Sequence, residues 1–313
     1  MLRYIIRRLL FAIPILIGVS LITFALFYLT VSPQQMARHN LSAKNPTPAQ
    51  IQGWLTEHGY DKSRSEQFKK HMTELFLFRF GKSDTTGEDI WSRIRSGVGP
   101  SALLGVLIFT ASLMTSITLA LFVAYYRGTY LDHWATFVLV LMMSVVYLVY
   151  IMGGQFVFGK LLKYFPFAGY QGGLSALNFL LLPTLIGVIS GLGSSVRFYR
   201  TVVLEEMNQD YVRTARAKGV GERAILFRHV LKNASIPILT SAVMGLPFIM
   251  LGSLLLESFF AIPGLGSLTV DAINSQDFAV VRAMVFLGTV LYIIGAVLTD
   301  ISYAIVDPRV RLE

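Results

Sequence analysis

The chain has 313 residues, of which 54% are hydrophobic and only 14% are charged, and its formal net charge is +9. About a quarter of the residues in soluble globular domains are charged, so this composition excludes an ordinary soluble protein and indicates a membrane protein. The chain contains no cysteine, which excludes disulfides and thiolate metal sites. The net charge could indicate a nucleic-acid partner, but membrane proteins also keep Lys and Arg mainly on their cytoplasmic side.

Six apolar runs have the length of about twenty residues that a helix needs to cross a bilayer. The sequence therefore predicts an all-α, polytopic membrane helix bundle with six transmembrane helices. The expected spans are 9–31, 101–126, 134–159, 177–198, 236–262 and 283–306.

The first span follows Arg3, Arg7 and Arg8, as the apolar part of a cleaved secretory signal does. Its apolar run is about twice as long as that of a signal peptide, and no cleavage motif of small residues follows it. Residues 1–31 are therefore predicted to form a retained N-terminal anchor helix.

The distribution of basic residues predicts the orientation. With the N-terminus in the cytoplasm, the cytoplasmic flanks hold fourteen Lys and Arg, Arg309 and Arg311 among them, while the opposite short loops hold only three: Lys160, Lys163 and Arg282. Because short cytoplasmic loops are enriched in Lys and Arg, both termini are predicted to be cytoplasmic.

Residues 32–100 then form a periplasmic subdomain, since a loop of this length is translocated largely regardless of its charge. The stretch "SRSEQFKKHMTELFLFRFG" predicts one helix, with Phe68, Met72 and Leu75 on one face. The stretch "DTTGEDIWSRIRS" predicts a second short helix, capped at Thr86. The subdomain could be a docking platform or a lid, or it could simply pack on the bundle.

The letters "GKS" at residues 81–83 resemble the end of a phosphate-binding loop. The glycine that such a loop requires five residues earlier is replaced by Phe76. Nucleotide binding at this segment is therefore rejected.

Residues 199–235 form a basic loop between the fourth and fifth spans. Helical patterns at 211–218 and 222–232 flank Gly219 and Gly221, which predicts a helix, a glycine turn and a second helix. A DNA-binding helix-turn-helix is disfavoured, because the flanking spans hold the unit close to the bilayer. If the basic residues served only to set the membrane topology, that would explain the charge of this loop. It would not explain the length of the loop, since connections between bundle helices usually take two to eight residues. A cytoplasmic partner with a matching groove explains both.

The sequence resembles the membrane-spanning permease subunits of ABC importers, in the dipeptide, oligopeptide and nickel branch. The stretch "YVRTARAKGVGERAILFRHVLKNASIPIL" is similar to the coupling loop of that branch, known as the EAA motif. The resemblance extends over nearly the whole chain, through "RYIIRRLLFAIPILIGVSLITFAL", "GYDKSRSEQFKKHM", "FRFGKS", "LLESFFAIPGLGSL" and "QDFAVVRAMVFLGTVLYIIGAVLTDISYAIVDPRV". The chain departs from the general motif at Arg213, Thr214 and Ala215, where Glu-Ala-Ala is usual, and lacks its Ile-x-Leu-Pro ending.

The resemblance implies that residues 101–313 form a five-helix permease core whose coupling loop, 199–235, docks on an ATPase. The implied partners are a second, homologous permease chain, two ATP-binding subunits, and a periplasmic or lipid-anchored substrate-binding protein. ATP and Mg would be bound by those partners, and no cofactor, metal or catalytic residue is expected in this chain, which is not itself an enzyme. The expected location is the inner membrane of a bacterium, as a multi-pass protein carrying peptides, or alternatively nickel or another small solute.

The residues expected to couple this chain to the ATPase lie in the predicted hairpin. Gly219 supplies a turn that a side chain would obstruct. The apolar and small positions are expected to dock, and the arginines to give polar or ionic contacts. The set is Arg213, Ala215, Arg216, Gly219, Arg223, Ile225 and Phe227.

Two ionisable residues near the ends of spans are further candidates, because charges at membrane depth are costly. Glu257 could line the substrate path, or it could bond to backbone donors of the turn that follows it. Asp300 is expected to pair with an arginine of the coupling region. Peptide as the substrate class remains open at this point, and so does the identity of the residues that line its path.

The sequence lacks the signals expected of two other classes of membrane protein. An ion-coupled secondary transporter would usually show paired repeats and several buried charges, and neither is evident. A membrane-embedded enzyme would need a catalytic cluster within the bilayer, but all five histidines lie outside the apolar runs.

Overall fold

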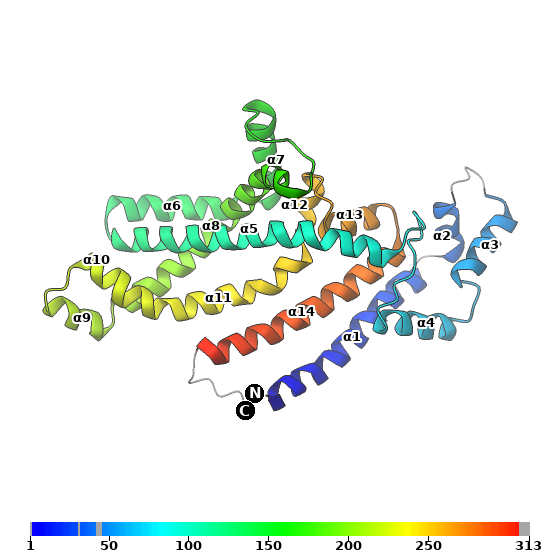
Figure 1. The fold of residues 1–313 in the computed structure, drawn as a ribbon, viewed down its shortest axis with the longest axis horizontal. Helices are drawn as coiled ribbons and strands as arrows, with labels where there is room; N and C mark the ends of the chain where they lie inside the picture. The colour runs from blue at the N-terminus through cyan, green and yellow to red at the C-terminus, as the bar shows by residue number, and fades with distance from the viewer. Residues whose placement is uncertain (1, 31, 42–45, 307–313) are drawn as a thin grey trace.

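The structure is a computed structural model that describes residues 2–30, 32–41 and 46–306, and within these ranges the chain is mostly helical (Figure 1). A single isolated bridge between Lys82 and Asp89 is the only β pairing in the described residues. The predicted all-α class is therefore confirmed. Arg309 and Arg311, which were counted for the orientation, lie outside the described residues.

Four described helices are long and apolar enough to cross a membrane. They belong to α1 (Leu2–Thr30), α5 (Ile90–Tyr125), α8 (Ala176–Met207) and α14 (Phe278–Val306). Their exposed sides carry Ile, Leu, Phe and Val, which is the surface that a helix presents to lipid. The four coincide with the predicted first, second, fourth and sixth spans.

The third predicted span, 134–159, is not one straight helix. Helix α6 (Tyr130–Ser144) stops at Val145 and Val146, and α7 (Tyr147–Gly154) leaves at an angle of 94° and continues as the π-helical turn η1 (Gln155–Leu161). Val145 and Val146 have extended backbones, and neither is Pro or Gly. Taken as one span, this bent pair raises the number of candidate spans among the described residues to five.

The fifth predicted span, 236–262, also differs. Helix α11 (Leu231–Leu251) starts earlier and ends at Gly252, whose φ of 74° lies in the left-handed region. The chain then forms two short helices, α12 (Leu254–Phe259) and α13 (Leu265–Asn274). A glycine with positive φ is a common helix terminator, so this break had a signal in the sequence.

Helix α5 packs along α8 and α11, and α14 packs against both α11 and α1. The short helices α9 (Asp210–Ala217) and α10 (Glu222–Ala224) lie at one end of the bundle, while α2 (Pro33–Asn40) and α3 (Pro48–His58) lie at the opposite end (Figure 1). The 3-10 turn η2 (Gly173–Ser175) precedes α8.

The segment before α5 contains three helices, α2 (Pro33–Asn40), α3 (Pro48–His58) and α4 (Arg64–Phe76). Helix α4 confirms the helix predicted from "SRSEQFKKHMTELF". Trp54 and Leu55 of α3 are buried against Met36 and Ala37 of α2, which gives this segment a small core of its own.

The second helix predicted in this segment is correct in type but wrong in its boundaries. It begins at Ile90, and its cap is Asp89, whose carboxylate accepts from the Ser92 N–H at 2.9 Å, rather than Thr86. It is also not short, since it continues without a break through Pro100 as the long apolar helix α5.

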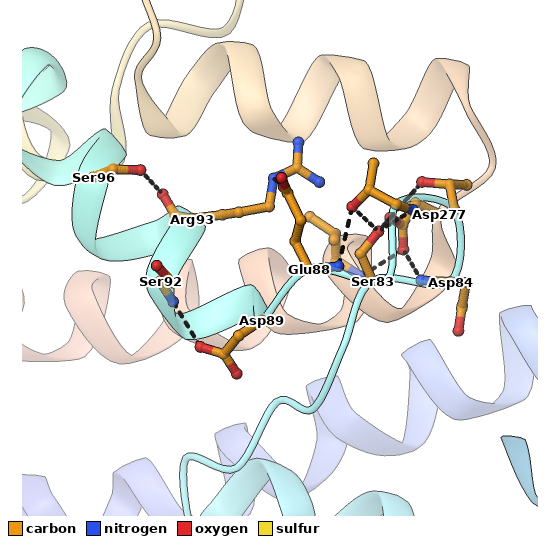
Figure 2. Close-up of polar contacts among 11 residues, drawn as sticks. Ser83, Asp84, Glu88, Asp89, Ser92, Arg93, Ser96 and Asp277 are labelled. Atoms are coloured by element: carbon orange, nitrogen blue, oxygen red, sulfur yellow. Dashed lines mark hydrogen bonds and ion pairs between the residues drawn. The ribbon is translucent and has the colours of Figure 1, made fainter. Parts of the chain in front are cut away.

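The "GKS" segment binds a carboxylate of the chain itself (Figure 2). Buried Asp277, which precedes α14, accepts hydrogen bonds from the hydroxyls of Ser83 and Thr85 and from the N–H of Asp84. It also accepts from the N–H of Val280, in the first turn of α14. The loop between α4 and α5 is thereby fastened to the start of the last helix.

Candidate functional site

The basic loop forms the predicted pair of short helices. Helix α9 ends in a turn in which the Gly219 N–H donates to Arg216 O at 2.9 Å and the Val220 N–H donates to Ala215 O at 3.2 Å. This is a Schellman ending, which requires a left-handed residue, and Gly219 has a φ of 77°. No atom lies within 4 Å of where a Cβ on Gly219 would stand, so the backbone conformation, rather than crowding, accounts for the glycine.

The second helix of the hairpin is short and irregular. After α10, the chain forms the π-helical turn η3 (Ile225–Val230), which leads directly into α11. The π-turn is unusual, because such turns are rare and are frequent at functional sites. Residues 210–230, which comprise α9, the glycine turn, α10 and η3, are called the hairpin below.

One face of the hairpin is buried against the ends of the long helices. Val212, Ala215, Ile225, Leu226 and Val230 form one apolar core with residues of α5, α8 and α11. The hairpin is therefore seated on the bundle rather than suspended from it. A force applied to the hairpin would reach α8 and α11 through close-packed side chains.

Burial divides the predicted coupling residues into two groups. Ala215 and Ile225 are only 7% and 1% exposed, so their side chains face the chain's own core and can affect docking only through the shape of the hairpin. Phe227, by contrast, is 61% exposed. The three predicted arginines and Gly219 also lie on the exposed side.

The arginines differ in their partners. Arg216 donates two hydrogen bonds to Glu222, at 2.6 and 3.0 Å, across the glycine turn. The hydrogen bonds from Arg216 lower the pKa of Glu222. Arg213 pairs with Asp210 at 3.2 Å, where both side chains are largely exposed to solvent. Among the described residues Arg223 forms no ion pair, so its charge is available to a partner.

An ion pair that the sequence interpretation missed lies beside the base of the hairpin. Asp132, in the first turn of α6, accepts from Arg200 of α8 at 2.7 and 2.9 Å and from the Gly128 N–H at 2.9 Å. Asp132 is only 8% exposed. The pair fixes the start of α6 to α8 seven residues before α8 ends. The sequence did carry a signal for this pair, because Asp132 is the only acidic residue in the apolar helix α6 and needs a partner when it is buried.

Glu257 is fully buried in the turn beyond α11. Its carboxylate accepts from the Ser101 hydroxyl at 2.9 Å and from three backbone N–H groups, those of Ser253, Gly266 and Ser267, at 2.7 to 3.2 Å. These are the contacts of the structural alternative, in which the glutamate organises the following turn. A Cβ on Gly264 would collide with this carboxylate, so the turn closes tightly around Glu257.

Asp300 does not pair with the coupling region. Its carboxylate lies 2.8 Å from Nε of Arg8, near the start of α1. The prediction of an arginine from the coupling loop was therefore wrong. Helix α14 packs along α1, as well as along α11, and this neighbour in space could not be read from the sequence order.

Comparison with known proteins agrees with this architecture. Residues 116–312 match the family described as binding-protein-dependent transport system inner membrane component, and residues 1–89 match the N-terminal family of the same transport systems. A Brucella abortus (strain 2308) protein provisionally named a peptide transport system permease is 33% identical over 99% of both chains.

Two further relatives carry related names. The Bacillus subtilis (strain 168) oligopeptide transport system permease protein AppB is 31% identical over 98% of this chain and 99% of its own. A Sinorhizobium fredii (strain NBRC 101917 / NGR234) protein provisionally named a peptide ABC transporter permease is 30% identical over the same shares. From the family match and these full-length similarities, the chain belongs to the inner membrane components of binding-protein-dependent transport systems.

Proposed function

We propose that the chain is the permease subunit of an ATP-driven importer and forms half of the pathway by which di- or oligopeptides cross the membrane. The observation that carries this proposal is the similarity, over the full length of the chain, to proteins named as peptide and oligopeptide permeases. The same architecture carrying nickel or another small solute is the alternative. The names of the full-length relatives favour peptide.

In the proposed topology the chain crosses a bacterial inner membrane six times. The spans are the four long helices, the bent pair of α6 and α7, and α11. Both termini and the hairpin lie in the cytoplasm, and α2 to α4 lie in the periplasm. The placement of α9 and α2 at opposite ends of the bundle supports this arrangement (Figure 1). So does the excess of Lys and Arg on the proposed cytoplasmic side.

The hairpin is proposed to dock in a groove of an ATP-binding subunit. Phe227 would insert as an apolar anchor, with Arg213, Arg216 and Arg223 around it, which is the usual anatomy of an interface hot spot. ATP and Mg would be bound by the partner. Closure of the ATPase would move the hairpin, and the shared core would transmit that movement to α8 and α11.

The complete assembly would contain this chain, a second homologous permease, two ATP-binding subunits and a substrate-binding protein. The binding protein would deliver peptide on the periplasmic side, to which α2 to α4 are assigned. No nucleic acid takes part, and this chain carries out no catalysis of its own.

Uptake of labelled peptides of two to six residues, measured in cells with and without the gene, tests the proposal. We expect ATP-dependent uptake to be lost in the deletion strain and restored by the intact gene. Uptake of labelled nickel, measured in the same strains, separates the alternative solute. Peptide uptake that persists with dissipated ion gradients, but stops without ATP, excludes an ion-coupled secondary transporter.

A further inference from the structure

Helices α5, α8 and α11 enclose a groove of about 540 Å³ whose walls carry no charge. None of its lining residues is Asp, Glu, Lys, Arg or His. The lining instead alternates apolar side chains with glycines, six serines and two tyrosines. A wall of this kind is polar enough to hold water or a peptide, and it neither attracts nor repels a peptide according to the charge of its side chains.

The groove runs along the middle of α5 and α8 and along the second half of α11. Its lining covers residues 101–113 of α5 and 187–199 of α8, and it extends from Ser241 of α11 to Gly252, which directly follows that helix. At 1.5 Å per residue each stretch is about 18 Å long. An extended peptide advances about 3.3 Å per residue, so the groove matches the length of about five residues.

The two ends of the groove coincide with features already described. Ser101 and Gly252 lie at one end, where Ser101 donates to the buried carboxylate of Glu257. Tyr199 lies at the other end and belongs to the apolar core that seats the hairpin. The groove therefore connects the turn that Glu257 holds with the core that would receive movement from the ATPase.

Each of the three helices contributes one serine hydroxyl without a partner. A serine in a helix usually donates to a carbonyl one turn earlier, as Ser190 does to Gly187 O at 2.9 Å. Within the described part of the chain, the hydroxyls of Ser112, Ser195 and Ser241 have no hydrogen-bond partner, and all three line the groove. Hydroxyls both donate and accept, so they suit the N–H and C=O groups that every peptide presents.

We propose that this groove holds the translocating peptide in an extended conformation and binds its main chain, so that the permease accepts peptides irrespective of side-chain charge. This inference rests on the proposed function and names the part of the chain that performs it. The three serines are positioned to bind peptide, and the absence of ionisable groups is what makes the pathway tolerant.

The absence of cysteine from the chain makes a sharp test possible. Ser112→Cys, Ser195→Cys and Ser241→Cys are each placed in the complete transporter, with all partner subunits free of cysteine, in proteoliposomes. Each is then labelled with an anionic or a cationic methanethiosulfonate of similar size. Uptake of an acidic, a neutral and a basic tripeptide is compared before and after labelling. Ser194→Cys is the matched control, because Ser194 is exposed on the same helix as Ser195 but does not line the groove.

Before labelling, we expect each variant to take up all three peptides more slowly than the parent transporter but in the same proportions, because a thiol binds main-chain N–H and C=O groups more weakly than a hydroxyl does. The anionic adduct should then slow the acidic peptide at least about tenfold more than the basic one, and the cationic adduct should reverse that order, because a fixed charge close to the path repels like charges. Bound peptide should protect the three groove positions from labelling. Ser194→Cys should show no charge preference.

Labelling that proceeds fully, but changes uptake equally for all three peptides or not at all, would overturn the proposal. So would groove cysteines that react in the isolated chain and are blocked in the assembled transporter without peptide, because a helix of the partner permease would then fill the groove. If the parent transporter moves no peptide, the proposed function itself fails. Uptake before labelling shows whether each variant has folded and assembled. If one variant fails to fold, the other two still test the proposal.

Discussion

Arg8 and Asp300 join the first and last long helices of the chain, with Nε of Arg8 2.8 Å from the carboxylate of Asp300. The two partners differ in their access to water, since the side chain of Arg8 is 45% exposed and that of Asp300 only 15%. A charge that loses its partner costs more when it is buried than when water can solvate it. Removing one partner should therefore not have the same effect as removing the other.

We expect Arg8→Ala to destabilise the protein more than Asp300→Asn does. Arg8→Ala leaves a mostly buried carboxylate unpaired, which should cost on the order of 1 to 2 kcal/mol after allowance for solvent screening. Asp300→Asn leaves an arginine that water can reach, and should cost less than about 1 kcal/mol. Thermal unfolding in detergent measures both, and the exchanged pair Arg8→Asp with Asp300→Arg should recover part of the loss. Equal losses in the two single variants would show that the difference in exposure between the partners does not matter, and an exchanged pair that recovers nothing would show that the ion pair does not hold these helix ends together.

Gly219 should tolerate substitution according to backbone conformation rather than size. An open space surrounds the position of its Cβ, but its φ of 77° is left-handed, so Gly219→Ala should cost about 1 kcal/mol and Gly219→Asn less. Gly219→Pro fixes φ near −65° and removes the N–H that donates to Arg216 O, so we expect it to abolish peptide-stimulated ATP hydrolysis while membrane insertion persists.

Gly221 is the matched control for this series, because it lies two residues away with a φ of −67°. Gly221→Ala should retain the ATP hydrolysis and uptake of the parent transporter. A Gly219→Pro transporter that remains fully active would show that the turn between α9 and α10 does not transmit movement.

The hairpin was predictable because its signals are local. Gly219 and Gly221 mark the turn, and buried apolar residues recur at helical spacing on each side of it, Val212 with Ala215 before it and Leu226 with Val230 after it. What the pattern could not tell is which apolar residues face the chain's own core and which face a partner. Ile225 and Phe227 are both apolar and two positions apart, yet one is 1% and the other 61% exposed.

The bonds from Glu257 to backbone donors of the following turn were one of the two alternatives read from the sequence. The bend between α6 and α7 and the contact of Glu257 with Ser101 were not predictable, for a different reason. Hydropathy measures how apolar a run of residues is and carries no information about the direction of the chain. A 94° bend at two valines, which are themselves apolar, therefore does not change the hydropathy of the run. The four donors that surround Glu257 come from two segments, with Ser101 lying 156 residues away in the sequence. Such long-range contacts follow from helix packing, which the sequence of one chain does not specify locally.

Asp277 should be sensitive even to an isosteric change. Its carboxylate accepts four hydrogen bonds, three of them from Ser83, Asp84 and Thr85 in the loop before α5 (Figure 2). The amide of Asp277→Asn would direct an N–H₂ group towards these donors, which should cost about 1 to 3 kcal/mol and release the loop. Limited proteolysis between α4 and α5 should become faster. Asp271→Asn, at an exposed site on α13, is the control and should change nothing.

His71 should make the segment of α2 to α4 less stable in mild acid. The side chain is 3% exposed, and burial, with the charge of Arg282 as the next cause, lowers its pKa to about 4 from an ordinary value of 6.5. Between pH 6.5 and pH 4 the unfolded chain therefore binds more protons at this residue than the folded chain does. The free energy of unfolding should fall as the pH falls through this window, by up to about 3 kcal/mol.

The variant His71→Gln isolates this effect. Glutamine can still donate an N–H to Ser20 O, as Nε2 of His71 does at 3.2 Å, but it does not titrate. The unfolding midpoint of this variant should change less between pH 6.5 and pH 4 than that of the parent protein. His133→Gln, which replaces an exposed histidine, should keep the parent's pH dependence. A parent protein whose stability is flat across the window would mean that His71 can take up a proton without loss of the fold.

Phe227 and Ile225 together separate docking from folding. Phe227→Ala removes a side chain that is 61% exposed, so it should leave the unfolding temperature nearly unchanged. If Phe227 is an anchor for the ATP-binding subunit, the same change should weaken association with that subunit at least tenfold and lower peptide-stimulated ATP hydrolysis.

Ile225→Ala opens a cavity in the core and should instead cost about 2 to 5 kcal/mol of stability. Binding of purified ATP-binding subunit to each variant, measured beside thermal unfolding, distinguishes the two effects. Normal association of the Phe227→Ala variant would place the docking surface elsewhere, because no other predicted docking residue on the exposed side of the hairpin offers a large apolar side chain.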